Sequence, residues 1–272
     1  IEFILFLLGL CALVVILSSL FSWYERANQH PQLMQDRFTP TRLLQTFNFV
    51  AIETVCLTLT VLFHPLGWLR PWRRKRPSYA TPVILLHGLF HNRACWWWLR
   101  LRLWLMGIRS LHSINLPHWK DVESLTERVA KRVDELRQSS GLSKVHLIGH
   151  SMGGIIARNY LQIRGGAEKV EHCILIASPN HGSRLATLAL SPLATDLMPE
   201  AELLQRLAAA PFPPAAQLTN IYSHHDNIVL PPQNAHLEGA NNIELTGVGH
   251  TTLLYHPRTV KTLLSLLTES RP

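Results

Sequence analysis

The residues KVHLIGHSMGGIIARNYLQIRGG (144–166) are the most informative part of this chain about its fold. Residues 144–150 form a short apolar run that predicts a buried strand, and residues 152–166 have the pattern of a helix. Between them lies GHSMG (residues 149–153), which matches the G-x-S-x-G pattern of a serine on a sharp strand-to-helix turn. The strand before it and the helix after it supply the context that this short pattern requires. We therefore interpret Ser151 as a candidate nucleophile.

The glycines of this turn have a steric purpose. A tight turn leaves no room for Cβ atoms at Gly149 and Gly153, and Gly154 permits still closer packing. Ser151 is thereby raised above the sheet, at the start of a helix whose dipole favours negative charge. The competing interpretation is an ordinary helix start at which Ser151 is the N-cap.

Together with this stretch, the second part of the chain alternates short apolar runs with helical patterns. The predicted strands cover residues 83–88, 110–116, 144–150, 170–179, 217–225 and 241–247, and the predicted helices cover residues 93–107, 121–141, 152–166 and 256–270. Strands that alternate with helices indicate an α/β architecture, in which a mostly parallel sheet carries helices on both faces. We expect residues 81–272 to form one such domain.

Two apolar segments precede this domain. Residues 3–22 carry no charged side chain, and about 20 apolar residues can span the hydrocarbon core of a bilayer. A cleaved signal peptide is the alternative, although its apolar region is normally shorter. The second segment, residues 47–69, contains Glu53, which is costly in a membrane. One interpretation of Glu53 is a polar contact between the two helices. The alternatives are a protonated or snorkelling side chain, or a second helix that lies in the membrane interface. Residues 1–76 are expected to anchor the chain in a membrane.

The net charge of +8 does not indicate nucleic-acid binding, because no nucleic-acid-reading motif accompanies it. Five basic side chains are concentrated in residues 70–76, directly after the second apolar segment, where they would meet anionic lipid headgroups. The loop between the segments is less basic, so the chain is expected to form a hairpin in a bacterial inner membrane with residues 81–272 in the cytoplasm. The four cysteines show no pairing pattern, and we expect no disulfide framework.

A serine nucleophile needs a base, and the base needs an acid that orients it. Both partners are expected at the carboxyl ends of later strands, with the acid before the histidine. Asp226 directly follows a predicted strand, whereas Asp196 lies in a segment rich in alanine, leucine and proline. His250 follows the next strand through a glycine-rich turn, so its loop can reach over Ser151. We predict Asp226 as the acid and His250 as the base, and no metal site.

The charge that develops on the attacked carbonyl oxygen needs two backbone N–H donors. One is expected from Met152, the residue after the nucleophile. The other is expected from Leu89, with Phe90 as second choice, in the loop after the strand that ends with His87 and Gly88. We expect His87 to brace this loop through hydrogen bonds.

Three blocks of sequence resemble the small bacterial lipases of class 2: PVILLHGL (82–89), GHSMGG (149–154) and IYSHHDNIVLPPQNAHLEGANNIELTGVGHTTLLYHP (221–257). The resemblance covers about residues 81–268, and the last block is its most specific part. It implies an α/β-hydrolase fold that acts on carboxylic esters without a cofactor. It places the catalytic residues of that family on Ser151, Asp226 and His250, and its oxyanion donors on Leu89 and Met152.

Two features leave alternatives open. The helix predicted for residues 93–107 is unusually rich in tryptophan, and it is either a lipid-facing or acyl-binding surface or a helix packed on the sheet. Residues 187–214 form either a small lid or a packed helical connection. The membrane segments are absent from the pattern of the small secreted lipases, so the resemblance does not imply extracellular fat digestion.

Three functions fit these residues. The first is a serine hydrolase that cleaves acyl esters, membrane lipids among them. The second is an acyltransferase, which would pass the same acyl group to an alcohol instead of water. The third is a non-catalytic membrane scaffold with the same fold, and the complete set of candidate catalytic residues argues against it.

Overall fold

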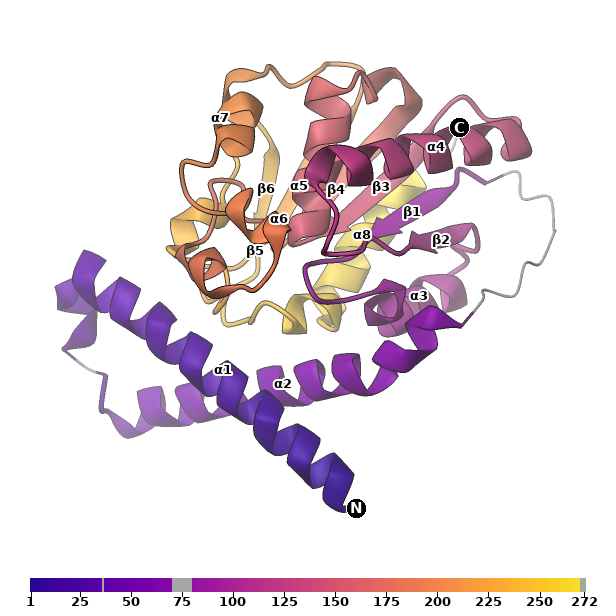
Figure 1. Ribbon diagram of the computed structural model, residues 1–272. Coiled ribbons are helices and arrows are strands. Elements are labelled where there is room, and N and C mark those ends of the chain that lie inside the picture. Colours follow the sequence, from indigo (N-terminus) through magenta and orange to yellow (C-terminus); the bar gives the residue numbers. More distant parts are fainter. Residues whose placement is uncertain (36, 70–79, 270–272) are drawn as a thin grey trace.

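The computed structural model describes residues 1–35, 37–69 and 80–269 of the chain, and Figure 1 shows how its elements are arranged. Strands and helices alternate from residue 83 onwards, as the sequence predicts. The expected mostly parallel α/β architecture, preceded by two apolar helices, is confirmed. The basic run of residues 70–76, on which the predicted orientation depends, lies outside the described residues.

Six strands form one parallel sheet in the order β2-β1-β3-β4-β5-β6. They are β1 (Val83–Leu86), β2 (Leu111–Ile114), β3 (Val145–His150), β4 (Val170–Ile176), β5 (Gln217–Tyr222) and β6 (Asn241–Glu244). Because all six run in the same direction, their carboxyl ends meet at one edge of the sheet. Strand β3, which leads into the GHSMG turn, lies inside the sheet and is buried along its whole length.

Helices cover both faces of this sheet. They are α3 (Trp97–Leu105), α4 (Val122–Ser140), α5 (Met152–Arg158), α6 (Pro192–Thr195), α7 (Glu202–Ala209) and α8 (Pro257–Glu269). Alternate residues of β1 separate the two layers, because neighbouring side chains on a strand point to opposite faces. Ile84 and Leu86 pack in one apolar cluster with α4 and α5. Val83 and Leu85 pack in a second cluster with α3 and α8.

Packing bears on the two alternatives that the sequence leaves open. Residues 187–214 form a packed helical connection, because α6 and α7 contribute leucines to the core: Leu193, Leu203, Leu204 and Leu207. In the tryptophan-rich helix, Trp96 is fully buried. The indoles of Trp97 and Trp98 donate hydrogen bonds to the hydroxyl and the carbonyl of Tyr255. This helix therefore packs on the sheet, and Trp104 remains 48% exposed at its far end.

The N-terminal segments form a helical hairpin of α1 (Glu2–Gln29) and α2 (Pro40–Phe63), which crosses along one side of the α/β domain (Figure 1). Both helices extend into the region predicted to be a polar loop. Residues 23–29 continue α1 because they include good helix formers such as glutamate, arginine and alanine. Helix α2 begins at Pro40, whose fixed φ suits the first turn of a helix.

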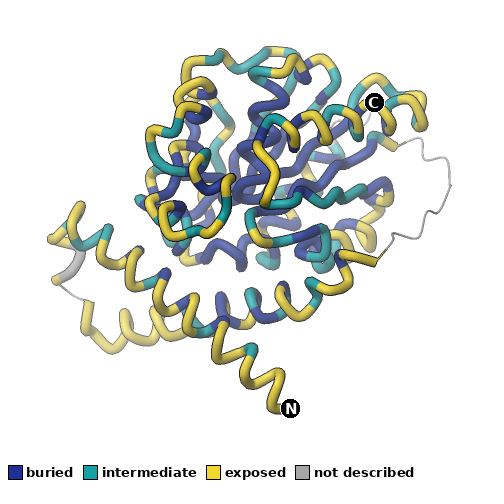
Figure 2. The backbone as a smooth tube through the Cα atoms, in the orientation of Figure 1, coloured by how far each residue is buried: buried dark blue, intermediate teal, exposed yellow. Residues whose placement is uncertain are grey.

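The two helices have polar and apolar sides. Most of their surface is exposed, as Figure 2 shows, and it carries many large apolar side chains. The buried positions include most of the polar side chains of the packed side: Ser18 and Ser22 on α1, and Glu53, Thr54, Thr58 and Thr60 on α2, beside Cys11, Val15 and Cys56. Both helices are long and apolar enough to cross a membrane. A soluble surface rarely exposes so large an apolar area, so this side of the hairpin needs a partner or a lipid environment.

Candidate active site

Ser151 lies on the sharp turn between β3 and α5. Its backbone has φ 54° and ψ −124°, which is strained for a residue with a side chain. The surrounding glycines make the turn possible. A Cβ on Gly149 would lie 2.5 Å from the carbonyl oxygen of Gly153, and one on Gly153 would lie 2.2 Å from that of Leu86. The glycines are therefore required sterically, and the turn leaves the Ser151 side chain 9% exposed at the carboxyl edge of the sheet.

Asp226 and His250 form a buried acid–base pair at the same edge. Asp226 follows β5 and is fully buried, and its Oδ2 lies 2.8 Å from Nδ1 of His250. Its other oxygen, Oδ1, accepts hydrogen bonds from the backbone N–H groups of Ile228 and Val229 at 2.7 and 2.9 Å. Both carboxylate oxygens are thus occupied, which fixes the carboxylate plane against the imidazole.

The imidazole of His250 is linked to the serine turn through His150. The rings of His150 and His250 lie 4.8 Å apart between centroids, and Nε2 of His150 lies 3.2 Å from the carbonyl oxygen of His250. Within the part of the chain that the structure describes, the Ser151 hydroxyl makes no hydrogen bond to the His250 ring. Serine–histidine bonds of this kind are often long before substrate binds.

Charge around His250 favours its protonated form. Burial by itself lowers the pKa of His250, but the carboxylates of Asp226 and Glu53 outweigh it, so the pKa is raised above its ordinary value. The neighbouring His150 has no such partner, and burial holds its pKa well below the ordinary value. Of these two rings, His250 is the one that can take up a proton near neutral pH.

The loop after β1 supplies candidate donors for an oxyanion. The backbone N–H groups of Leu89 and Met152 have no acceptor among the described residues, so both are available to a ligand. Phe90, the residue after Leu89, has φ 60°. His87 braces this loop: its Nδ1 lies 2.8 Å from the Gly88 carbonyl, and its Nε2 accepts the Leu116 N–H at 2.8 Å.

His87 therefore uses both ring nitrogens in its neutral form. Burial lowers its pKa to about 4, so it stays uncharged at neutral pH. Gly88 leaves room next to the nucleophile, because a Cβ there would lie 3.0 Å from Cβ of Ser151. Together, these contacts bring the β1 loop against the serine turn.

Several residues of this site carry no recognisable signal in the sequence. Asn227 accepts the backbone N–H of His250 on its Oδ1, and its Nδ2 donates to the Ser18 hydroxyl of α1 at 2.7 Å. Glu53 accepts hydrogen bonds from the two residues after His250. The interpretations of Glu53 as a contact between the two helices or as a snorkelling side chain are wrong. Its partners belong to the α/β domain.

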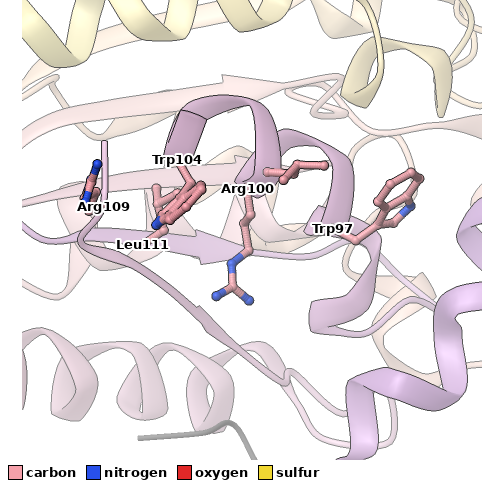
Figure 3. A pocket seen from close by; sticks show the side chains of 6 residues that line it. Trp97, Arg100, Trp104, Arg109 and Leu111 are labelled. Atoms are coloured by element: carbon pink, nitrogen blue, oxygen red, sulfur yellow. The ribbon is translucent and has the colours of Figure 1, made fainter. Parts of the chain in front are cut away.

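A separate hollow lies between α3 and β2 and is lined by Trp97, Arg100, Trp104, Arg109 and Leu111 (Figure 3). Leu111 begins β2 and Arg109 lies two residues before it, whereas Ser151 directly follows the carboxyl end of β3. The hollow is therefore remote from the acid–base pair, and we do not assign it to the active site.

Known proteins share parts of this sequence and this fold. A family model for the alpha/beta hydrolase fold matches residues 113–212, a range that includes Ser151. The structure resembles crystalline lipase BlEst2 of Bacillus licheniformis in its mature form, with a TM-score of 0.64 and 20% identity. That likeness covers 74% of this chain and 98% of the lipase. The chain has an α/β-hydrolase fold.

Sequence relatives of this chain include two bacterial triacylglycerol lipases. The lipase of Pseudomonas fragi is 31% identical over 113 residues, which are 39% of this chain and 36% of the lipase. The lipase of Pseudarthrobacter phenanthrenivorans is 29% identical over 131 residues, which are 44% of this chain and 40% of the lipase. The chain thus aligns with about two fifths of the length of these relatives. The predicted resemblance to bacterial lipases is confirmed.

Proposed function

We propose that this protein is a serine hydrolase that cleaves carboxylic esters through an acyl-enzyme on Ser151. The observation that carries the proposal is the buried Asp226–His250 pair, 2.8 Å apart, at the sheet edge that bears the strained Ser151 turn. A buried carboxylate that holds an imidazole at this distance stabilises the imidazolium that forms when the base takes a proton. The lipase relatives support ester cleavage as the reaction.

In the first half of the proposed reaction, the Ser151 oxygen attacks the ester carbonyl while Nε2 of His250 takes the hydroxyl proton. The N–H groups of Leu89 and Met152 bind the oxyanion of the tetrahedral intermediate. The intermediate collapses, the C–O bond to the alcohol breaks, and His250 gives its proton to the departing oxygen. An ester of the acyl group with Ser151 remains.

Water completes the cycle. His250 removes a proton from a water molecule as the water oxygen attacks the acyl carbonyl. The second tetrahedral intermediate releases the carboxylic acid and returns the proton to Ser151. Asp226 keeps the Nδ1 proton of His250 directed away from the serine throughout. No cofactor takes part in this scheme.

The hairpin suggests that the substrate is a membrane lipid. The exposed sides of α1 and α2 are apolar, and we propose that residues 1–76 anchor the chain by placing these sides in lipid, with the catalytic domain of residues 81–272 at the membrane surface. Ser18 and Glu53 on the opposite side contact the loops of Asp226 and His250. The active site would therefore lie close to the bilayer, on the cytoplasmic side if the basic run follows the positive-inside rule.

The nucleophile can be tested with the full chain in detergent. Ser151→Ala should abolish hydrolysis of a short-chain nitrophenyl ester and covalent labelling by a fluorophosphonate probe. Ser110→Ala, a buried serine on the opposite edge of the sheet, is the matched control and should keep both. Turnover or labelling that survives in Ser151→Ala, in a protein with an unchanged circular dichroism spectrum, would reject the assignment.

A further inference from the structure

Glu53 is the one acidic residue of α2, and it is only 1% exposed. Three donors converge on its carboxylate. The backbone N–H of Thr251 donates to Oε1 at 2.7 Å, and the N–H and hydroxyl of Thr252 donate to Oε2 at 2.9 and 2.6 Å. A carboxylate in an apolar helix is costly unless it is fully hydrogen-bonded, and these contacts satisfy it. Glu53 is therefore built into the α/β domain.

The residues that Glu53 holds come directly after His250. The backbone of residues 247–249, just before His250, has few steric restrictions, because Gly247 has φ 75° and Gly249 carries no side chain. A Cβ on Gly249 would lie 2.3 Å from Oε2 of Glu53, so the carboxylate packs directly against this backbone. Glycine at 249 thus lets the helix approach, and the three hydrogen bonds replace the rigidity that the glycines remove.

The first helix of the hairpin, α1, contacts the loop of the acid. The Ser18 hydroxyl accepts from Nδ2 of Asn227, and the Ser22 hydroxyl donates to the Asp226 carbonyl at 3.4 Å. Oδ1 of the same Asn227 accepts the N–H of His250. Each helix of the hairpin therefore holds one of the two loops that carry the acid–base pair.

The charge of Glu53 also acts on the imidazole. The titratable groups around the His250 ring are Asp226, Glu53, His91 and His150. Burial lowers the pKa of His91 to about 3 and that of His150 well below its ordinary value, so both are neutral. The charges that act on His250 are thus the two carboxylates, and both favour its protonated form.

We propose that Glu53 is a positioning residue of the active site, through which the apolar hairpin holds the loop of the catalytic base and adds a second negative charge beside the imidazole. The proposal rests on the proposed function, since it takes His250 as the base. It makes the hairpin part of the catalytic apparatus in addition to its role as an anchor.

The test is Glu53→Gln in the full chain. The glutamine amide has no charge and keeps only one acceptor oxygen. Its NH2 group would face N–H or O–H donors of Thr251 and Thr252, which it cannot satisfy. We expect kcat to fall about 10- to 100-fold, the loss typical of a misplaced catalytic group, with KM changed less than about threefold. The acidic limb of the kcat/KM profile should move to lower pH, because the imidazolium loses a stabilising charge. Glu53→Asp, which keeps the charge, should keep the limb near its wild-type position.

Thr60→Val is the matched control for docking. The Thr60 hydroxyl lies 2.8 Å from the Tyr255 hydroxyl, so this variant weakens the contact of the same helix with the domain but leaves the hydrogen bonds of Glu53 to Thr251 and Thr252 in place. The acidic limb of the kcat/KM profile of this variant should stay at its wild-type pH. If Thr60→Val and Glu53→Gln lower kcat equally and neither variant shifts the acidic limb of the kcat/KM profile, Glu53 is only a docking contact. That result would overturn the proposal. Wild-type kcat in Glu53→Gln would overturn it as well.

Two further measurements separate this proposal from the proposed function. If Glu53→Gln does not fold, Thr252→Val removes one of the three donors and should lower kcat by a smaller factor, and an unchanged kcat would contradict the proposal. If the wild-type protein hydrolyses no ester, the proposed function fails. NMR titration of the His250 ring then still tests Glu53, because the charge effect predicts a lower pKa in Glu53→Gln.

Discussion

Asp226→Asn tests the acid of the proposed site by a change of a single atom. The Asn side chain can keep the two backbone hydrogen bonds to Oδ1 from Ile228 and Val229. Its amide group, however, would place N–H donors opposite Nδ1 of His250. That nitrogen must then accept, so the ring carries its proton on Nε2 and cannot take the proton of Ser151. We expect an intact fold and a nearly inactive enzyme.

The size of the loss follows from the geometry. A carboxylate and an imidazolium 2.8 Å apart attract each other by about 6 kcal/mol at an effective dielectric of about 20. Each 1.36 kcal/mol of barrier corresponds to about a tenfold change in rate, so losing this attraction predicts a decrease in kcat of about 10⁴-fold. The same substitution in a serine protease with this catalytic arrangement lowers kcat by about 10⁴-fold, which agrees with the calculation.

The assay is steady-state hydrolysis of a soluble nitrophenyl ester by the full chain in detergent. Asp196→Asn is the matched control, because Asp196 is a half-buried aspartate at the end of α6 and should be dispensable. A kcat within tenfold of wild type in Asp226→Asn would refute the reasoning. Loss of activity in Asp196→Asn, with Asp226→Asn unaffected, would transfer the role of the acid to Asp196.

Two further predictions concern the charge of His250 and the environment of α1. Because the base must be neutral to act and its pKa is raised, kcat/KM should rise with pH through a midpoint above 6.5, and a midpoint below 6.5 would contradict this charge balance. Leu13→Arg, on the exposed side of α1, should reduce recovery of the protein in the membrane fraction, since a central arginine costs about 2.5–3.5 kcal/mol on insertion scales. Gln138→Arg on exposed α4 is its control, and equal recovery of both variants would argue against lipid contact at Leu13.

The sequence alone determined the α/β alternation, because strand and helix patterns report local geometry and need no knowledge of distant contacts. It also predicted a site built from three residues that are distant along the chain. Ser151 stands in a recognisable turn motif, and Asp226 and His250 follow strands whose carboxyl ends share one edge. The 2.8 Å contact between Asp226 and His250 lies at that edge.

Only the tertiary structure decided how the hairpin relates to this site. Glu53 and Thr251 are 198 positions apart, and no periodicity in either segment reports that α2 packs on the His250 loop. In the sequence, Glu53 is an acidic residue in an apolar stretch, which resembles a defect in a membrane helix. In the folded chain, the backbone N–H donors that satisfy it come from a loop whose position depends on the whole sheet. The role of a polar residue in an apolar helix depends on its spatial neighbours, and those are set by docking rather than by local sequence.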